Sequence, residues 1–192
     1  MPDIYPELLR RCRKKDRKAQ NDLYRLCFPM LMPVCMRYCK NEEEAREYLN
    51  LGFYKILTQL KKYPEHVPFE AWSKRVLINL IIDELRKKKT YRKHVEVLED
   101  KTVGEEGGYN FEQPEISAEE IYGFIRSLPP KTAAVFNLYA LDGYTHKEVA
   151  GLLKIGEGTS KWHYSEARKQ LKAMIEKART LRHKKLSYGK AV

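Results

Sequence analysis

Residues 143–171 read GYTHKEVAGLLKIGEGTSKWHYSEARKQL, a pattern that predicts two helices joined by a short turn. Thr145 and Glu148 have the spacing of a capping box, which opens a helix running to about residue 153. A turn containing Gly156 follows, and a second helix begins near residue 157. Two helices with a short glycine-containing turn between them, the second rich in basic and polar side chains, are typical of a helix-turn-helix.

The second helix of this motif predicts a DNA-binding surface. Its first turns would enter a major groove, and its later basic side chains would meet phosphates. An ordinary helical hairpin with a solvated basic face is the alternative. We favour DNA binding because the capping box, the turn and the basic surplus agree. The candidate contacts are Thr159, Ser160, Lys161, Trp162, Ser165, Glu166, Arg168, Lys169 and Lys172.

The remainder of the carboxyl-terminal block is also helical in pattern. Ser117 and Glu120 form a second capping box, Pro130 suits the first turn of a helix, and Gly143 suits the end of one. A basic segment at the end of the chain is expected to be frayed. We therefore expect helices over residues 117–127, 130–142, 145–153 and 157–177, and a basic tail over residues 179–192.

The amino-terminal block shows apolar residues at helical spacing through most of residues 4–93. Pro64 and Pro68 interrupt this pattern and predict a loop over residues 62–68. The expected helices lie near residues 5–14, 16–38, 42–61 and 69–89. No long alternation argues for strands, so the predicted fold class is all-α.

Charge separates the two helical blocks. The net charge of the 192 residues is +11, of which residues 1–94 carry +10, residues 95–116 carry −6 and residues 117–192 carry +7. The acidic middle segment contains several glycines and little periodicity, which indicates a flexible linker. A surface loop within one domain is the alternative, but structureless loops of that length are uncommon in compact domains. We expect two small helical domains joined by this acidic linker.

The sequence lacks the residues that several classes of function require. The sequence has no apolar run long enough for a membrane span and no apolar signal core at its amino terminus, so we expect a cytoplasmic protein. The five histidines are scattered, and no phosphate loop or nucleophile motif occurs, so we expect neither an enzyme nor a cofactor. Metal-ligand spacing is also absent, and we expect buried, reduced thiols at Cys12, Cys27, Cys35 and Cys39.

Two groups of motifs carry a resemblance to a known family. The carboxyl-terminal group comprises residues 143–150, 158–161 and 167–168, and the other comprises residues 69–72, Asn79 and residues 83–87. In this order they resemble the extracytoplasmic-function (ECF) sigma factors of bacterial RNA polymerase. The resemblance implies that residues 117–178 are region four, which reads the minus-35 promoter element. It also implies that residues 1–94 are region two, which melts and reads the minus-10 element.

Region two would hold single-stranded DNA through aromatic stacking and cationic contacts to phosphates. The resemblance points to a loop and helix that could form a pocket for a flipped base. Phe69 and Trp72 also fit the apolar core, and this alternative stays open. The candidate minus-10 residues are Tyr63, Phe69, Trp72, Lys74, Arg75, Asn79, Arg86 and Lys87.

The implied polymerase-binding helix departs from the family pattern. The family usually has an acidic residue, then a glutamine and a second acidic residue, before a phenylalanine. Aligned on Phe53, this chain has Glu47, Asn50 and Leu51 instead, and the second charge is missing. We expect these four residues to contact the polymerase clamp helices through a weakened or re-specified interface.

The resulting hypothesis is an alternative sigma factor that binds core RNA polymerase and directs promoter recognition and transcription initiation. Family members are commonly held inactive by an anti-sigma factor, so such a partner is implied. The alternative is a helix-turn-helix regulator that binds duplex DNA without polymerase and uses residues 1–94 for dimerisation or ligand sensing. Specific duplex binding by the chain alone would favour that alternative.

Overall fold

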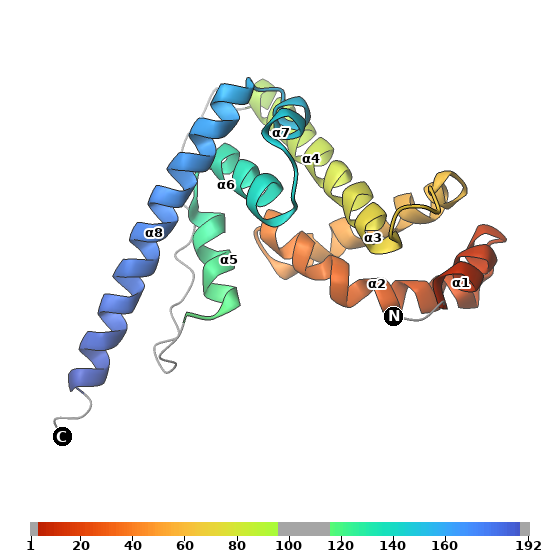
Figure 1. Cartoon of the computed structure of the whole chain (residues 1–192), viewed down its shortest axis with the longest axis horizontal. Coiled ribbons are helices and arrows are strands. Elements are labelled where there is room, and N and C mark those ends of the chain that lie inside the picture. The colour runs from red at the N-terminus through yellow and green to blue at the C-terminus, as the bar shows by residue number, and fades with distance from the viewer. Residues whose placement is uncertain (1–3, 96–115, 189–192) are drawn as a thin grey trace. The chain divides into compact units, whose positions relative to one another are not determined.

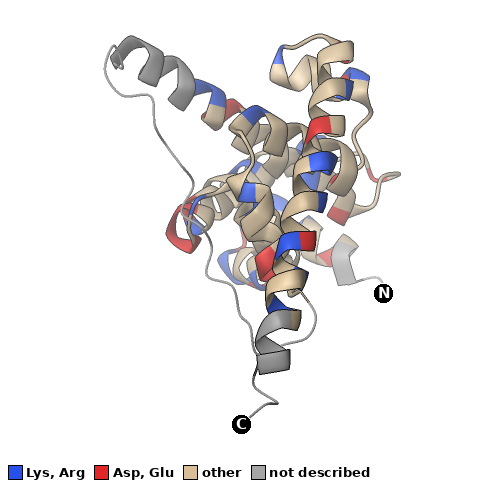
Figure 2. Ribbon diagram, turned by 90° about the vertical axis from the view of Figure 1, so that its left-hand side faces the viewer, with Lys and Arg blue, Asp and Glu red and all other residues tan. Residues whose placement is uncertain are grey.

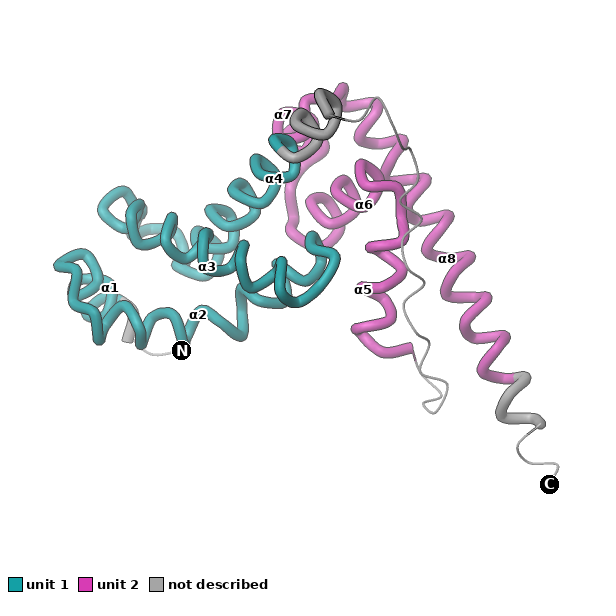
Figure 3. Tube along the Cα trace, turned by 180° about the vertical axis from the view of Figure 1, so that it is seen from behind, with its two compact units in different colours: residues 1–99 teal, residues 100–192 magenta. Residues whose placement is uncertain are grey.

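The computed structural model describes residues 4–95 and 116–188 of the chain. These ranges contain helices and no strand, which confirms the all-α prediction. The chain forms two compact units, unit 1 (residues 1–99) and unit 2 (residues 100–192), coloured separately in Figure 3. The predicted acidic linker lies outside the described residues, except for Val95 and Ile116 at its ends.

Unit 1 contains the four expected helices (Figure 1). They are α1 (Ile4–Arg13), α2 (Arg17–Tyr38), α3 (Glu42–Gln59) and α4 (Phe69–Val95), with a 3-10 turn, η1 (Leu60–Lys62), after α3. Side-chain caps set two of the starts, because the Asp16 carboxylate accepts from the Ala19 amide and the Asn41 side-chain oxygen accepts from the Glu44 amide. Local sequence therefore determines where α2 and α3 begin.

The core of unit 1 forms where α2, α3 and α4 pack against one another. Leu23, Leu49, Ile56, Leu77 and Ile81 are among its fully buried side chains. The four cysteines are buried and free, as the sequence predicts. Burial raises the pKa of Cys12 to about 11 and the pKa values of Cys27 and Cys35 to about 12. These three thiols therefore stay protonated at neutral pH.

Unit 2 begins with α5 (Ala118–Ser127) and α6 (Pro130–Phe136) and ends with α7 (His146–Leu153) and α8 (Glu157–Tyr188). Both predicted capping boxes form, with reciprocal hydrogen bonds at the starts of α5 and α7. The expected helix over residues 130–142 is wrong in part, because it widens into a π-helical segment, Asn137–Leu141. The wider turn buries Asn137 and Leu138, and Gly143 at φ +75° follows it.

The end of α8 corrects the prediction of a frayed tail over residues 179–192. The helix continues to Tyr188, and Ala178 and Arg182 are buried. Figure 1 shows α8 as one long helix alongside α5. Arg182 pairs with Glu120 near the start of α5 at 2.5 Å, while residues 189–192 lie outside the described part of the chain. A long-range ion pair thus orders a segment that looks like a tail in the sequence.

Candidate nucleic-acid interface

The helix-turn-helix consists of α7, a turn over residues 154–156 and α8. Lys154 closes α7 in the left-handed conformation, φ 52° and ψ 54°, and the Ile155 amide donates to the Ala150 carbonyl. Val149 on α7 and Ala167 on α8 are both fully buried, which places the two helices in close contact. The first turns of α8 therefore stand at the surface in a defined orientation.

Two histidine–hydroxyl hydrogen bonds fix the start of α8. His146 Nδ1 lies 2.9 Å from the Ser160 hydroxyl oxygen, and His163 Nδ1 lies 3.0 Å from the Thr132 hydroxyl oxygen. The His146 ring also stacks on Tyr139, with 3.9 Å between ring centroids. These bonds join α7 and α6 to neighbouring turns of α8. Sequence reasoning missed this role of the histidines because their partners are 14 and 31 residues away.

The structure exposes most of the predicted minus-35 residues. Trp162 is 60% exposed, and Lys161 is exposed in an ion pair with Glu157 at 2.8 Å. Half-buried Glu166 accepts a hydrogen bond from Gln170 at 2.7 Å. Figure 2 shows cations along α8 with acidic residues between them. The remaining exposed members of the set are Thr159, Ser165, Arg168, Lys169 and Lys172.

Ser160 differs from the other predicted minus-35 residues, because no part of it is exposed. Its side chain is fully buried, and its hydroxyl is already bonded to His146. The helical register turns residue 160 toward α7 while its neighbours at 159 and 161 face solvent. Ser160 therefore joins α8 to α7 and is not part of the exposed surface of α8.

His163 predicts a pH dependence for unit 2. Burial, with Lys131 nearby, lowers the pKa of His163 below its ordinary value of 6.5, so the fold favours the neutral ring. Stability should be fully present above about pH 6.5 and should fall as the pH drops through the lowered value, because the unfolded chain takes up the proton first. Thermal unfolding at about pH 7.5 and about pH 5.5 checks this.

His163→Gln should reduce the acid sensitivity of the thermal stability of unit 2, since the glutamine side chain does not titrate. His183→Gln, which changes an exposed histidine on the same helix, is the control and should leave it unchanged. Equal acid sensitivity in wild type and His163→Gln would contradict the assignment.

An aromatic cluster occupies the loop between η1 and α4. Tyr63 lies 5.6 Å from Phe69 and 5.0 Å from Trp72 between ring centroids, and the Tyr63 hydroxyl donates to the Val67 carbonyl. Phe69 is only 3% exposed, which agrees with the alternative that it belongs to the apolar core, and it contacts both Tyr63 and Trp72. Tyr63 and Trp72 are half-buried and remain candidates for base stacking.

A polar strip continues from this cluster along α4. Trp72, Asn79 and Arg86 are seven residues apart and therefore lie along one side of the helix. The Asn79 side-chain oxygen is buried without a hydrogen-bond partner among the described residues. Exposed Arg75 and exposed Lys87, which pairs with Glu84, lie beside the strip, whereas half-buried Lys74 lies on the opposite side of α4.

The predicted polymerase-binding face of α3 is mainly exposed. Glu47, Asn50 and Leu51 face solvent, and the Asn50 side-chain oxygen accepts from the Tyr24 hydroxyl at 3.0 Å. Phe53 does not lie on this exposed face, because it is 7% exposed and packs edge-on against Tyr24 inside the unit. Sequence reasoning missed Tyr54, which is 69% exposed. Its position three residues after Leu51 was the available signal.

The described residues form neither a metal site nor a membrane-spanning helix. Across residues 4–95 and 116–188, no group of three or more metal-ligating side chains could hold a metal ion. None of the helices in these ranges has the length and apolarity needed to cross a bilayer.

The two units match two separate family models. The model described as Sigma-70 region 2 matches residues 23–91, and the model described as Sigma-70, region 4 matches residues 118–171. A curated relative, the ECF RNA polymerase sigma factor SigW of Bacillus subtilis (strain 168), is 26% identical over 180 residues. This alignment covers 87% of the present chain and 94% of SigW.

A solved structure shares the fold. The sigma factor RpoE, crystallised in complex with the anti-sigma factor NepR from Bartonella quintana, aligns with a TM-score of 0.56 and 15% identity. The alignment covers 81% of this chain and 96% of that one. With region 2 on one helical unit and a region 4 helix-turn-helix on the other, the chain belongs to the ECF group of the sigma-70 family of RNA polymerase sigma factors.

Proposed function

We propose that this alternative sigma factor brings core RNA polymerase to promoters with two unlike elements, and that each unit reads one of them. The observation that carries the proposal is the presence of both regions in one chain, each with an exposed candidate surface. A regulator acting without polymerase would leave the region 2 match unexplained. The chain supplies specificity, has no catalysis of its own and works in the cytoplasm with the polymerase.

Unit 2 would read the duplex minus-35 element through the start of α8. Lys161 is the first candidate, since a lysine can donate to the acceptors of guanine in the major groove. Its ion pair with Glu157 is solvent-exposed and therefore weak, so DNA can replace the carboxylate. Trp162 and Ser165 would contact neighbouring bases, and the cations farther along α8 would contact phosphates.

Unit 1 would hold the melted minus-10 element on the polar strip of α4. Trp72 and Tyr63 offer stacking faces, and the adjacent cations offer phosphate contacts. The unpartnered oxygen of Asn79 supports a hydrogen bond from a base amino group or from another donor on the strand.

The α3 face would bind the polymerase with more apolar character than the family pattern implies. Leu51 and Tyr54 are both large and exposed, and they lie on the same helix as the polar candidates Glu47 and Asn50. An anti-sigma factor is the second protein partner that we propose, because the solved relative was crystallised with one.

Lys161→Ala tests the minus-35 assignment. Holoenzyme reconstituted with the variant should lose about 5- to 150-fold in promoter binding, the effect of about 1–3 kcal/mol for one base contact. Affinity for core polymerase should stay unchanged, because residue 161 is not on the polymerase face. Competition binding to a promoter mapped by in vitro transcription measures both quantities.

Lys177→Ala is the matched control, since Lys177 is an exposed lysine farther along α8 and outside the candidate set. The loss caused by Lys161→Ala should disappear when the minus-35 element is scrambled. An equal loss on intact and scrambled promoters would contradict the proposed role of Lys161.

A further inference from the structure

The turn between α1 and α2 carries a cluster of cations that neither candidate promoter surface includes. Residues 10–18 read RRCRKKDRK, with seven cations and a single carboxylate. Asp16 alone cannot neutralise them, and the surrounding sequence supplies few other acids. We call residues 10–18 the basic turn.

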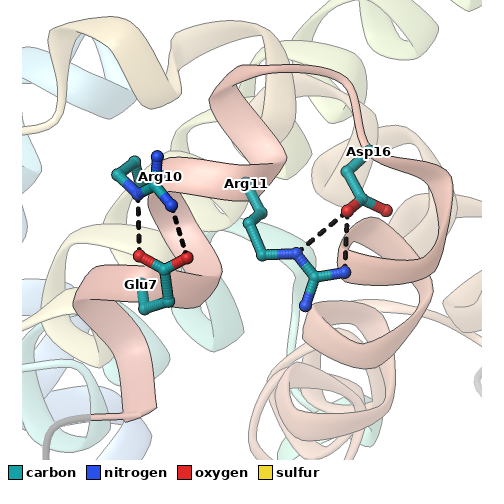
Figure 4. Close-up of polar contacts among 4 residues, drawn as sticks. All are labelled: Glu7, Arg10, Arg11 and Asp16. Atoms are coloured by element: carbon teal, nitrogen blue, oxygen red, sulfur yellow. Dashed lines mark hydrogen bonds and ion pairs between the residues drawn. The ribbon is translucent and has the colours of Figure 1, made fainter.

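Three of the seven cations are held by carboxylates. Arg10 pairs with Glu7 at 2.6 Å and Arg11 with Asp16 at 2.7 Å, as drawn in Figure 4. Arg13 pairs with Glu65 at 3.2 Å. These three guanidinium groups therefore have partners within the unit.

The other four cations have no such partner. Lys14, Lys15, Arg17 and Lys18 are all exposed, and the described residues place no carboxylate within ion-pair distance of them. Lys15 has φ 62°, a left-handed conformation in which glycine would be unstrained. A lysine therefore occupies a position best suited to glycine, and it adds a charge beside three other unpaired cations at the same turn.

Arg13 connects the basic turn to the loop that carries the aromatic cluster of unit 1. Arg13 Nε donates to the Leu60 carbonyl at 3.2 Å, and its Nη1 pairs with Glu65 in the loop that follows η1. The same loop begins with Tyr63, which contacts Trp72. One arginine thus joins the end of α1 to the segment that carries the stacking candidates.

We propose that the basic turn binds the phosphate backbone of the single-stranded DNA whose bases stack near Tyr63 and Trp72. Aromatic faces beside a cationic track are the combination that proteins use to hold single strands without reading their sequence. The contact is to the phosphodiester groups, so it should be independent of base identity. The inference rests on the proposed function, since it extends the minus-10 surface of unit 1.

The test removes three charges of the basic turn together, as Lys14→Gln, Arg17→Gln and Lys18→Gln. Lys15 is kept, because a change at its positive φ would alter the turn itself. The control triple, Lys40→Gln, Lys177→Gln and Arg179→Gln, removes two exposed lysines and one exposed arginine elsewhere. Both variants lose three positive charges. A difference in their DNA binding therefore reports where the charges lie and not the change in net charge.

Binding of the full-chain holoenzyme to a fork-junction probe with a single-stranded minus-10 segment is measured against salt concentration. Each single-strand phosphate contact contributes about 0.7 to the slope of log affinity against log salt, so the test triple should lower that slope by about 2. The control triple should keep the wild-type slope. Affinity for core polymerase should be the same in all three proteins.

A second probe carries neutral methylphosphonates in place of the phosphates of the single-stranded segment. Wild-type holoenzyme and the test triple should bind this probe with the same affinity, because the phosphate charges that the basic turn would contact are absent for both. A wild-type slope in the test triple, or a loss confined to core polymerase binding, would overturn the inference. If wild-type holoenzyme starts no transcription at any promoter, the proposed function fails instead.

Discussion

Arg182→Met should destabilise unit 2 by about 3 kcal/mol or more, because it leaves the buried carboxylate of Glu120 without its cation. Arg182 is 2% exposed and Glu120 is 9% exposed, and the two form an ion pair at 2.5 Å. Methionine keeps most of the apolar stem but supplies no charge. The carboxylate of Glu120 would then be buried without its cation, a state that costs far more than an exposed ion pair contributes.

The same pair predicts how acid acts on unit 2. Burial opposes ionisation of Glu120, but the hydrogen bonds from Arg182 and Ser117 outweigh it and lower the pKa of the carboxyl from 4.5. The stabilisation is therefore present above about pH 4.5 and lost as the pH falls through the lowered value. Arg182→Met should lack this acid-induced loss, since its Glu120 no longer gains from being ionised.

Amide hydrogen exchange on the full chain measures the effect, with α5 and α8 as the reporters and α2 and α3 as an internal reference. Arg179→Met, an exposed arginine on the same helix, should change stability by less than about 0.5 kcal/mol. Adding Glu120→Gln to Arg182→Met should recover part of the loss, because glutamine keeps the capping box and removes the stranded charge. Equal protection in Arg182→Met and Arg179→Met would show that the pair does not hold α8.

Gly52→Ala should destabilise unit 1 by about 1–3 kcal/mol, the usual cost of overpacking a core. A Cβ atom at residue 52 would lie 2.2 Å from Leu77 Cδ1 and 3.4 Å from its Cγ. Leu77 is fully buried on α4, so its side chain has little space in which to move. The clash should outweigh the gain of about 1 kcal/mol that alanine normally has over glycine within a helix.

Urea unfolding followed by tryptophan fluorescence tests this in a Trp162→Phe background. Trp72 is then the sole tryptophan, and its contact with Tyr63 makes it a reporter of unit 1. Leu77→Val should restore part of the stability lost in Gly52→Ala, because it removes the clashing Cδ1. Gly151→Ala in α7, where no atom lies within 4 Å of the added Cβ, should not destabilise unit 2, which amide hydrogen exchange in α7 reports because unit 2 has no tryptophan in this background. Destabilisation of similar size by both glycine changes would count against the packing explanation.

Helix positions were predictable where the signals are local. Asp16, Asn41, Ser117 and Thr145 cap helices through side chains that reach only three residues along the chain. The sequence did not predict the π-helical segment, Asn137–Leu141. Its wider turn depends on the packing that buries its side chains and not on a local capping residue.

Candidate site residues were predictable where helical register alone exposes them. Lys161 and Trp162 lie on the outer face of α8, as the motif implies. The sequence did not decide the burial of Ser160, Phe53 and Phe69, because a residue's burial depends on neighbours contributed by other segments. His146 covers Ser160, Tyr24 packs on Phe53, and Tyr63 packs on Phe69.

The sequence by itself determined the two helical blocks, the helix-turn-helix and the family, because capping, periodicity and motif spacing act within a few residues or a single helix. Only the tertiary structure decided which side chains are buried by other segments and that the basic residues 179–188 are helical. Arg182 is ordered by a carboxylate 62 residues away, and Arg13 is joined to a loop 52 residues away. Such contacts form only when segments that are distant in the sequence fold against each other, so no local sequence pattern predicts them.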